Sequence, residues 1–213
     1  MIHAKCMMAA PLALVLAASA FLGGCLGKPG PVEEYLRVGG GDAACSQDTQ
    51  TGKARVAVAL RQVKSADALD RQAVMLARGL VMSPSLRWYW EASPCRLAEQ
   101  ALVRAVNCTP GLAAIWPVRS TTEAPLSMTV ALTAFEVQEQ PPVMNAAMDC
   151  QIWDGSGTKL LAARTFSAQV PARALDAQAI AEAGSRALSG LSGEVAQWVA
   201  SLSMTRVPGV PGK

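Results

Sequence analysis

Along most of the chain, apolar side chains alternate with polar or small ones, a period of two that is typical of β-strands with one buried face. Between residues 126 and 170, two alternating stretches flank Asp154-Gly155-Ser156-Gly157, which predicts a hairpin with its turn at those four residues. The phase changes near Ala134, which indicates a β-bulge. Strands are expected at residues 35–38, 55–61, 72–78, 85–90, 126–137, 144–152 and 159–170, with a short apolar piece at 113–116.

Two stretches change to a helical period. Ser93-Pro94 predicts a helix start, because serine supplies a capping oxygen and proline suits the first turn. A second helix is expected at about 175–202, where large apolar residues recur every three or four positions after a stripe of small ones that includes Gly184. The buried stripe of the first helix is expected to comprise Cys95, Ala98, Ala101, Leu102 and Ala105.

The order of strands, helix, strands and helix predicts an α+β fold. The economical arrangement is a single mixed β-sheet with two helices packed on one face. The connection that follows Trp90 is long enough for a parallel crossover.

The strand at 85–90 is rich in aromatic residues. Leu86, Trp88 and Trp90 are expected to share one face, and at least one of the tryptophans should belong to the core. Arg87 and Tyr89 point the other way and are the candidates for facing a partner.

The chain begins with an apolar run of about 16 residues behind Lys5, which is shorter than the roughly 20 that span a bilayer and is typical of a secretory signal peptide. The run ends in Leu22-Gly23-Gly24-Cys25, which resembles the lipobox of bacterial lipoproteins. That resemblance implies cleavage before Cys25 and its modification with acyl chains such as palmitate, several of which hold a protein firmly on a membrane. The alternative is an ordinary cleaved signal with an incidental cysteine. The residue after Cys25 is Leu26 and not an aspartate, which by the same resemblance favours sorting to the outer membrane, facing the periplasm.

These features divide the chain into four parts. Residues 1–24 form the predicted signal peptide with its lipobox, and residues 25–34 a lipidated tether rich in glycine and proline. Residues 35–203 form the domain, and residues 204–213 are expected to be a disordered tail.

Composition removes several classes of function. The net charge is only +3 and no basic tract exists, which argues against a nucleic-acid partner. His3 is the single histidine and lies in the signal peptide, so the mature chain lacks Ser-His and Cys-His pairs and histidine zinc sites. The sequence also has no P-loop. We therefore expect no catalytic residue, cofactor or metal; the alternative of an enzyme using carboxylates alone rests on Asp149 and Asp154.

Four cysteines remain after Cys25. Their even number in an oxidising compartment predicts two disulfides among Cys45, Cys95, Cys108 and Cys150, and the alternative is four buried thiols. A helix of about 11 residues between Cys95 and Cys108 separates them by roughly 16 Å, too far for a bond. Cys45 is therefore expected to bond to Cys95 or Cys108.

The layout resembles the ABC-type transport auxiliary lipoprotein family (PqiC-like) from about Tyr35 to Leu202. The matching features are a tyrosine-containing strand soon after the anchor, Trp90-Glu91-Ala92-Ser93-Pro94 opening a helix, and paired long strands around Asp154-Gly155 before a terminal helix. The resemblance implies a non-catalytic outer-membrane lipoprotein that works with an MCE-domain protein, a permease and an ATPase in moving lipids between the two membranes. It also implies homo-oligomers. The alternative function is a stand-alone envelope lipoprotein with its own apolar ligand, which requires a closed cavity of about 300 Å³ or more lined by Met, Leu and Trp.

Overall fold

The structure is a computed structural model of the 213-residue chain. It describes residues 30, 32–39, 55–119 and 124–206, with the side chains of the last helix described as far as Ser203. The signal peptide, Cys25, most of the tether, Cys45 and the residues after Arg206 lie outside this part. The chain divides into two units, Met1–Val32 and Glu33–Lys213, and the fold described here is that of the second.

The second unit is built on one mixed sheet of nine strands. The strands are β1 (Glu34–Leu36), β2 (Val56–Leu60), β3 (Lys64–Ser65), β4 (Ala73–Arg78), β5 (Val81–Trp90), β6 (Leu112–Ile115), β7 (Leu126–Glu139), β8 (Pro142–Asp154) and β9 (Leu160–Pro171). β7 is the centre of the sheet. Along one edge it pairs antiparallel with β8, which pairs antiparallel with β9. Along its other edge β2, β3 and β4 follow one another, all parallel to β7.

Three strands complete the sheet beyond this row. β6 pairs parallel with β2, while β5 pairs antiparallel with β4. β1 is the edge strand and pairs parallel with β5, with Glu34 opposite Trp88 and Leu36 opposite Trp90. Because the two strands are parallel, Glu34 is the residue of β1 that lies nearest to the start of β5.

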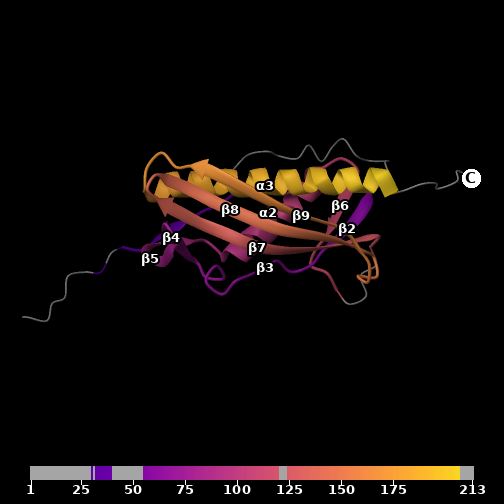
Figure 1. Cartoon of the computed structure of the whole chain (residues 1–213), viewed down its shortest axis with the longest axis horizontal. Coiled ribbons are helices and arrows are strands. Elements are labelled where there is room, and N and C mark those ends of the chain that lie inside the picture. Colours follow the sequence, from indigo (N-terminus) through magenta and orange to yellow (C-terminus); the bar gives the residue numbers. More distant parts are fainter. Residues whose placement is uncertain (1–29, 31, 40–54, 120–123, 207–213) are drawn as a thin grey trace, which may run out of the picture. The chain divides into compact units, whose positions relative to one another are not determined.

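Two helices of the described chain, α2 (Pro94–Cys108) and α3 (Ala177–Arg206), cover one face of the sheet (Figure 1). The core lies between them and the inward side chains of the long strands, since Met128, Phe135, Met148 and Ile152 are fully buried. The opposite face of the long strands carries mostly small and polar side chains, most of which are exposed or half-buried. The predicted α+β fold is confirmed.

The predicted strands and the bulge of β7 are confirmed as well. The register of β7 against β8 shifts between Leu132 and Ala134, which keeps apolar side chains inward on both sides of the shift. The short strand β3 was not predicted, because its two residues, Lys64 and Ser65, carry no alternation.

The first half of α3 carries small side chains, and Trp90 packs against it at Gly184. The Trp90 side chain is fully buried, with its ring centroid 5.0 Å from that of Phe135. A Cβ atom on Gly184 of α3 would lie 3.0 Å from the Trp90 ring, which is tighter than most side-chain contacts, so a larger residue there would require the indole to shift. One tryptophan of β5 is thus core, as expected, while Trp88 is half-buried and its indole N–H donates to Glu34 at 3.0 Å.

Three local expectations were wrong. Leu86 does not share the buried face of Trp90 but is 76% exposed, because β5 shifts register against β4 in this region and the Ser85 hydroxyl accepts the backbone N–H groups of residues 87 and 88. Ser93 occupies the N-cap of α2 without a side-chain cap bond; its carbonyl instead accepts the first helical N–H groups. The final helix extends to Arg206, beyond the expected start of the tail at residue 204.

Candidate functional site

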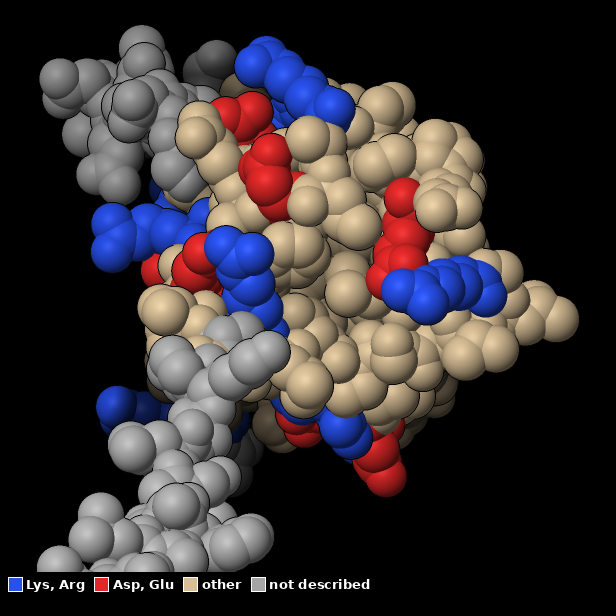
Figure 2. Space-filling view, turned by 90° about the vertical axis from the view of Figure 1, so that its left-hand side faces the viewer, with Lys and Arg blue, Asp and Glu red and all other residues tan. Residues whose placement is uncertain are grey.

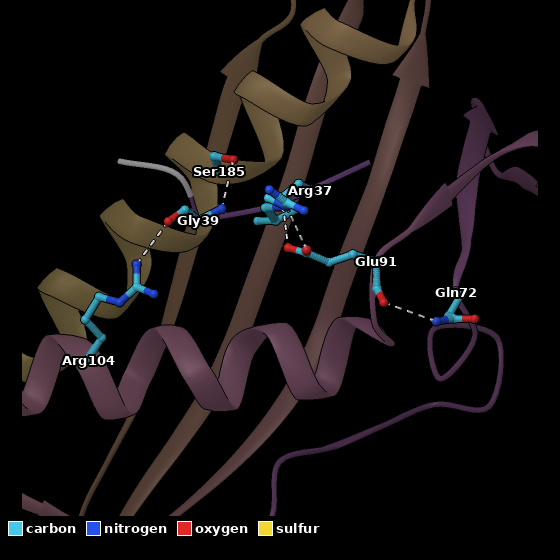
Figure 3. Close-up of polar contacts among 7 residues, drawn as sticks. Arg37, Gly39, Gln72, Glu91, Arg104 and Ser185 are labelled. Carbon is cyan, nitrogen blue, oxygen red and sulfur yellow. Dashed lines mark hydrogen bonds and ion pairs between the residues drawn. The ribbon is translucent and has the colours of Figure 1, made fainter. Parts of the chain in front are cut away.

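The residues that follow the tether are held at a corner formed by Glu91, the first residue after β5. One carboxylate oxygen of Glu91 accepts the backbone N–H of Val38 at 2.9 Å, and the other pairs with Arg37 at 3.3 Å. Its backbone N–H donates to the carbonyl of Leu36, and its carbonyl accepts the side-chain amide of Gln72 (Figure 3). A single residue therefore joins β1, the β5–α2 junction and the segment before β4.

Gly39 is held next to this corner by both helices. Its backbone N–H donates to the hydroxyl of Ser185 on α3 at 3.2 Å, and its carbonyl accepts the guanidinium of Arg104 on α2 at 3.0 Å (Figure 3). Its φ of 108° lies in the region that glycine alone adopts readily. Together with Glu91, these contacts form what we call the entry clamp: Glu91, Arg104 and Ser185 around residues 37–39.

The entry clamp borders an open groove between α2 and α3. The groove has a volume of about 360 Å³ and an apolar floor that includes Leu97 and Leu188. The rest of its lining mixes apolar residues such as Val38 and Ala101 with polar ones, and the buried hydroxyl of Ser192 has no hydrogen-bond partner within the part of the chain that the structure describes. The alternative function requires a closed cavity lined by Met, Leu and Trp; this groove is open and neither Met nor Trp lines it, so only its apolar part matches that requirement.

The two residues predicted to face a partner lie at the sheet edge beside β1. Arg87 pairs with Glu34 at 2.7 Å and lies over the Trp88 ring, and the ring of Tyr89 stacks on Tyr35 with centroids 5.6 Å apart. Both side chains therefore contact β1 and neighbouring residues. Whether they also contact another protein stays a prediction.

The open sheet face holds a second groove, at the end near the β8–β9 turn. It has a volume of about 800 Å³ and is lined by Arg61, Lys64, Asp149, Gln151, Trp153 and their neighbours. The Trp153 indole donates to Thr129 at 3.2 Å. Further along the same face, burial raises the pKa of Glu136 above its usual range.

The two carboxylates of the enzyme alternative have structural partners. Asp149 accepts the Thr165 hydroxyl at 2.6 Å across the β8–β9 ladder. Asp154 accepts backbone N–H groups of Lys159 and Thr158 as well as the Ser156 hydroxyl, and the Lys159 bond is the main cause of its lowered pKa. These bonds fix the predicted hairpin turn. Within the described residues, no group of three His, Cys, Asp or Glu side chains is arranged to hold a metal ion.

Two of the four candidate disulfide cysteines are free thiols, so the prediction of disulfides at Cys95 and Cys150 was wrong. Cys95 lies on the buried side of α2 and contacts the Ser65 hydroxyl at 3.1 Å. Burial raises the pKa of the Cys95 thiol, and it raises that of Cys150 to about 12. Cys108 is disulfide-bonded, and Cys45 lies outside the described residues.

Glu91 is the functional side chain that sequence reasoning missed. The sequence points to it only through its position, because it follows the buried Trp90 and precedes the helix start at Ser93-Pro94. Backbone N–H groups near a strand-to-helix junction can lack partners, and a carboxylate at the junction can accept hydrogen bonds from such groups.

Comparisons with known proteins identify a family and a shared fold. Residues 41–196 match the model of a family described as ABC-type transport auxiliary lipoprotein component. Protein XCC0632 from Xanthomonas campestris has a similar fold, with a TM-score of 0.64, 15% identity, and coverage of 82% of this chain and 95% of that one. An uncharacterized protein of known structure gives a TM-score of 0.62, 13% identity and coverage of 79% and 99%. A search of the curated proteins found no match. Neither of the two described helices is both long and apolar enough to cross a membrane.

Proposed function

The chain belongs to the ABC-type transport auxiliary lipoprotein family, and from this premise we propose that it is a membrane-anchored, non-catalytic subunit of a system that moves lipids between the inner and outer membranes. Acyl chains on Cys25 hold it at the periplasmic face of the outer membrane, after removal of the signal peptide at residues 1–24. Its partner is an MCE-domain protein of the transporter. It binds no cofactor and no nucleic acid.

The entry clamp is the observation that supports an anchored, docking role. Residues 37–39 come directly after the proposed tether, and Glu91, Arg104 and Ser185 fix them against the sheet and both helices. This arrangement connects the anchored end of the chain firmly to the body of the domain. A domain that positions a partner relative to a membrane needs such a fixed connection, whereas a freely diffusing binding protein does not.

The carboxylates support the absence of catalysis. Asp149 and Asp154 are occupied by hydrogen bonds of the β8–β9 hairpin, and Glu99, which is buried in α2, accepts the Val63 N–H and pairs with Arg96. Carboxylates that carry structural bonds are poorly placed to exchange protons with a substrate.

The sheet edge supports assembly of several copies. β9 pairs only with β8, so the other edge of this twelve-residue strand meets no further described strand. Unpaired edges of this length are usually covered by another chain or protected. We therefore propose a homo-oligomer, which native mass spectrometry of the detergent-solubilised protein tests directly.

Mass spectrometry of the purified native chain tests the anchor. The proposal requires a mature terminus at Cys25 that carries acyl groups. An unmodified Cys25, or a mature terminus elsewhere, would remove the anchor from the account.

A pull-down from solubilised envelope tests the partner. Wild-type protein should recover an MCE-domain protein, and Arg87→Ala should reduce that recovery if the edge beside β1 is the docking surface. Arg164→Ala is the matched control, because Arg164 is also an exposed arginine over an aromatic neighbour, Phe166, but lies on β9. Repeated recovery of the wild-type chain without any MCE-domain protein would contradict the proposed partner.

The groove between α2 and α3 favours one second candidate, a lipoprotein that carries an apolar ligand itself. Its volume of about 360 Å³ lies at the low end of the range for small-molecule sites. Lipid extraction from the purified monomer distinguishes the two, because a carrier should retain stoichiometric lipid and a docking subunit should not.

A further inference from the structure

The turn between β4 and β5 exposes apolar side chains where polar ones are usual. Arg78 pairs with Val81, so Gly79 and Leu80 form a two-residue hairpin loop, with Gly79 at a φ of +61°. Turn positions of this kind favour Gly, Asn, Asp and Ser. Here Leu80 is fully exposed and Val81 is 70% exposed.

Two further apolar residues of β5 are exposed as well. Met82 and Leu86 are both exposed, so four large apolar side chains lie along one hairpin: Leu80, Val81, Met82 and Leu86. We call these four residues the apolar hairpin. Single exposed apolar residues are ordinary on protein surfaces, but a group of them on a projecting element indicates contact with an apolar partner.

The apolar hairpin lies at one end of the sheet. β1 runs parallel to β5, so Glu34 is the residue of β1 that lies nearest to this end. The turn between β7 and β8 lies at this end too, since Ala77 pairs with Gln138. Figure 1 shows β4 and β5 at this end, opposite the end at which α3 finishes.

The tether is long enough for the hairpin to reach the membrane. Eight residues lie between Cys25 and Glu34, and the nine steps from one to the other span about 30 Å at full extension. Leu80 lies eight residues from Trp88, the partner of Glu34, which corresponds to at most about 26 Å along β5. An anchor at Cys25 therefore allows the turn to touch the bilayer surface, and it holds the hairpin there at a high effective concentration.

The charges around the apolar hairpin are paired. Arg78 forms an ion pair with Glu139, and Arg87 forms one with Glu34. Figure 2 views this end of the domain: uncharged side chains form much of its surface, and basic and acidic side chains lie beside each other rather than in patches of one sign. This end is thus suited to an apolar environment and not to a strongly charged partner.

We propose that the apolar hairpin inserts into the surface of the phospholipid leaflet that carries the anchor, with Leu80 and Val81 deepest. This contact rests on the proposed acylation of Cys25 and adds a second point of attachment. Two points of attachment fix the orientation of the domain on the membrane, with the end of α3 directed away from it.

An environment-sensitive fluorophore tests the insertion. The acylated full-length mature chain carrying Leu80→Cys is labelled with NBD maleimide and reconstituted into vesicles of phosphatidylethanolamine and phosphatidylglycerol, with and without brominated acyl chains. Cys95 and Cys150 are buried and escape labelling under native conditions. Leu160→Cys is the matched control, because Leu160 is also an exposed leucine at a hairpin end but lies at the far end of the sheet.

The proposal predicts a blue shift of NBD emission and quenching by brominated lipid when the probe is at position 80. Neither effect is expected when the probe is at position 160. Equal signals at the two positions would overturn it. A shift at position 80 that appears without vesicles and grows with protein concentration would assign the hairpin to a second copy of the chain, which also overturns it. Mass spectrometry of the same sample separates the two proposals, because a missing acyl group defeats the anchor, whereas an unquenched probe on acylated protein defeats the insertion alone.

Discussion

Replacing Gly184 by alanine should destabilise the domain, although alanine normally strengthens a helix. In the interior of a helix such as α3, glycine costs about 1 kcal/mol relative to alanine. At Gly184, however, the new methyl group would lie 3.0 Å and 3.2 Å from two atoms of the Trp90 ring. The Trp90 ring is fully buried and contacts Phe135. The backbone N–H of Trp90 also donates to the carbonyl of Gln72, so this residue has little freedom to move.

The size of the effect is the difference between the helix-propensity gain of alanine and the cost of overpacking the core. Overpacking a well-filled core by one methyl group costs about 1–3 kcal/mol, which cancels or exceeds the propensity gain. Gly190 of the same helix has no atom within 4 Å of a Cβ placed on it, so Gly190→Ala should gain the full stabilisation of about 1 kcal/mol. The two variants should therefore differ in unfolding free energy by about 1–3 kcal/mol, the overpacking cost alone.

Urea unfolding of the mature chain, followed by tryptophan fluorescence, measures this difference. Gly184→Ala should have a lower midpoint than Gly190→Ala at a similar slope. If both substitutions stabilise the protein equally, the contact between Trp90 and α3 is not as close as described. A second variant set with Trp90→Phe checks the same point, because a smaller ring should reduce the penalty of alanine at position 184.

Three further predictions concern the entry clamp and the cysteines. Glu91→Ala should speed tryptic cleavage after Arg37 about fivefold, because losing these partly exposed bonds costs about 1 kcal/mol of local stability; an unchanged rate in a fully folded variant would contradict the clamp. The thiol of Cys150, whose pKa is raised from 9.0 to about 12 by burial, should resist Ellman's reagent at pH 8 until the protein unfolds. The neutral Cys150 thiol contributes fully to the free energy of unfolding below pH 9, and this contribution is lost as the pH rises towards 12. Unfolding of the wild type and of Cys150→Ala, each measured at pH 8 and at pH 11, would reveal the loss. Finally, non-reducing peptide mapping should recover Cys45 linked to Cys108, because the other two candidates are free thiols; recovery of Cys45 as a free thiol would refute that pairing.

Local periodicity was sufficient to predict the main elements. Alternation identified β7 and its bulge at Ala134, because a period of two is a property of each strand and its buried face. The hairpin turn at Asp154 was predicted from its four polar and small residues, and the structure adds the side-chain bonds that fix it.

The contacts between distant segments could not be read from the sequence. The small side chains at the start of α3 were visible, but nothing local indicated that Gly184 makes room for Trp90, which lies 94 positions earlier. The bond from Val38 to Glu91 joins residues 53 positions apart, and it depends on β1 adding to the sheet beside β5.

The prediction of disulfides at Cys95 and Cys150 failed for a related reason. An even number of cysteines indicates disulfides only if their side chains meet, and that is decided by tertiary packing. Cys95 instead contacts Ser65 beneath α2, and Cys150 lies on the buried face of β8.

The pairing of β1 also determines how the domain would withstand mechanical load. β1 is the first strand after the proposed tether and runs parallel to β5, so a pull along its axis would load the hydrogen bonds between these two strands. The hydrogen bonds between the two strands are then sheared together rather than opened one after another. Behind them, the bonds of Glu91 and Gly39 resist the same force, so tension between membrane and partner would be borne by the body of the sheet and both helices before the chain could peel away.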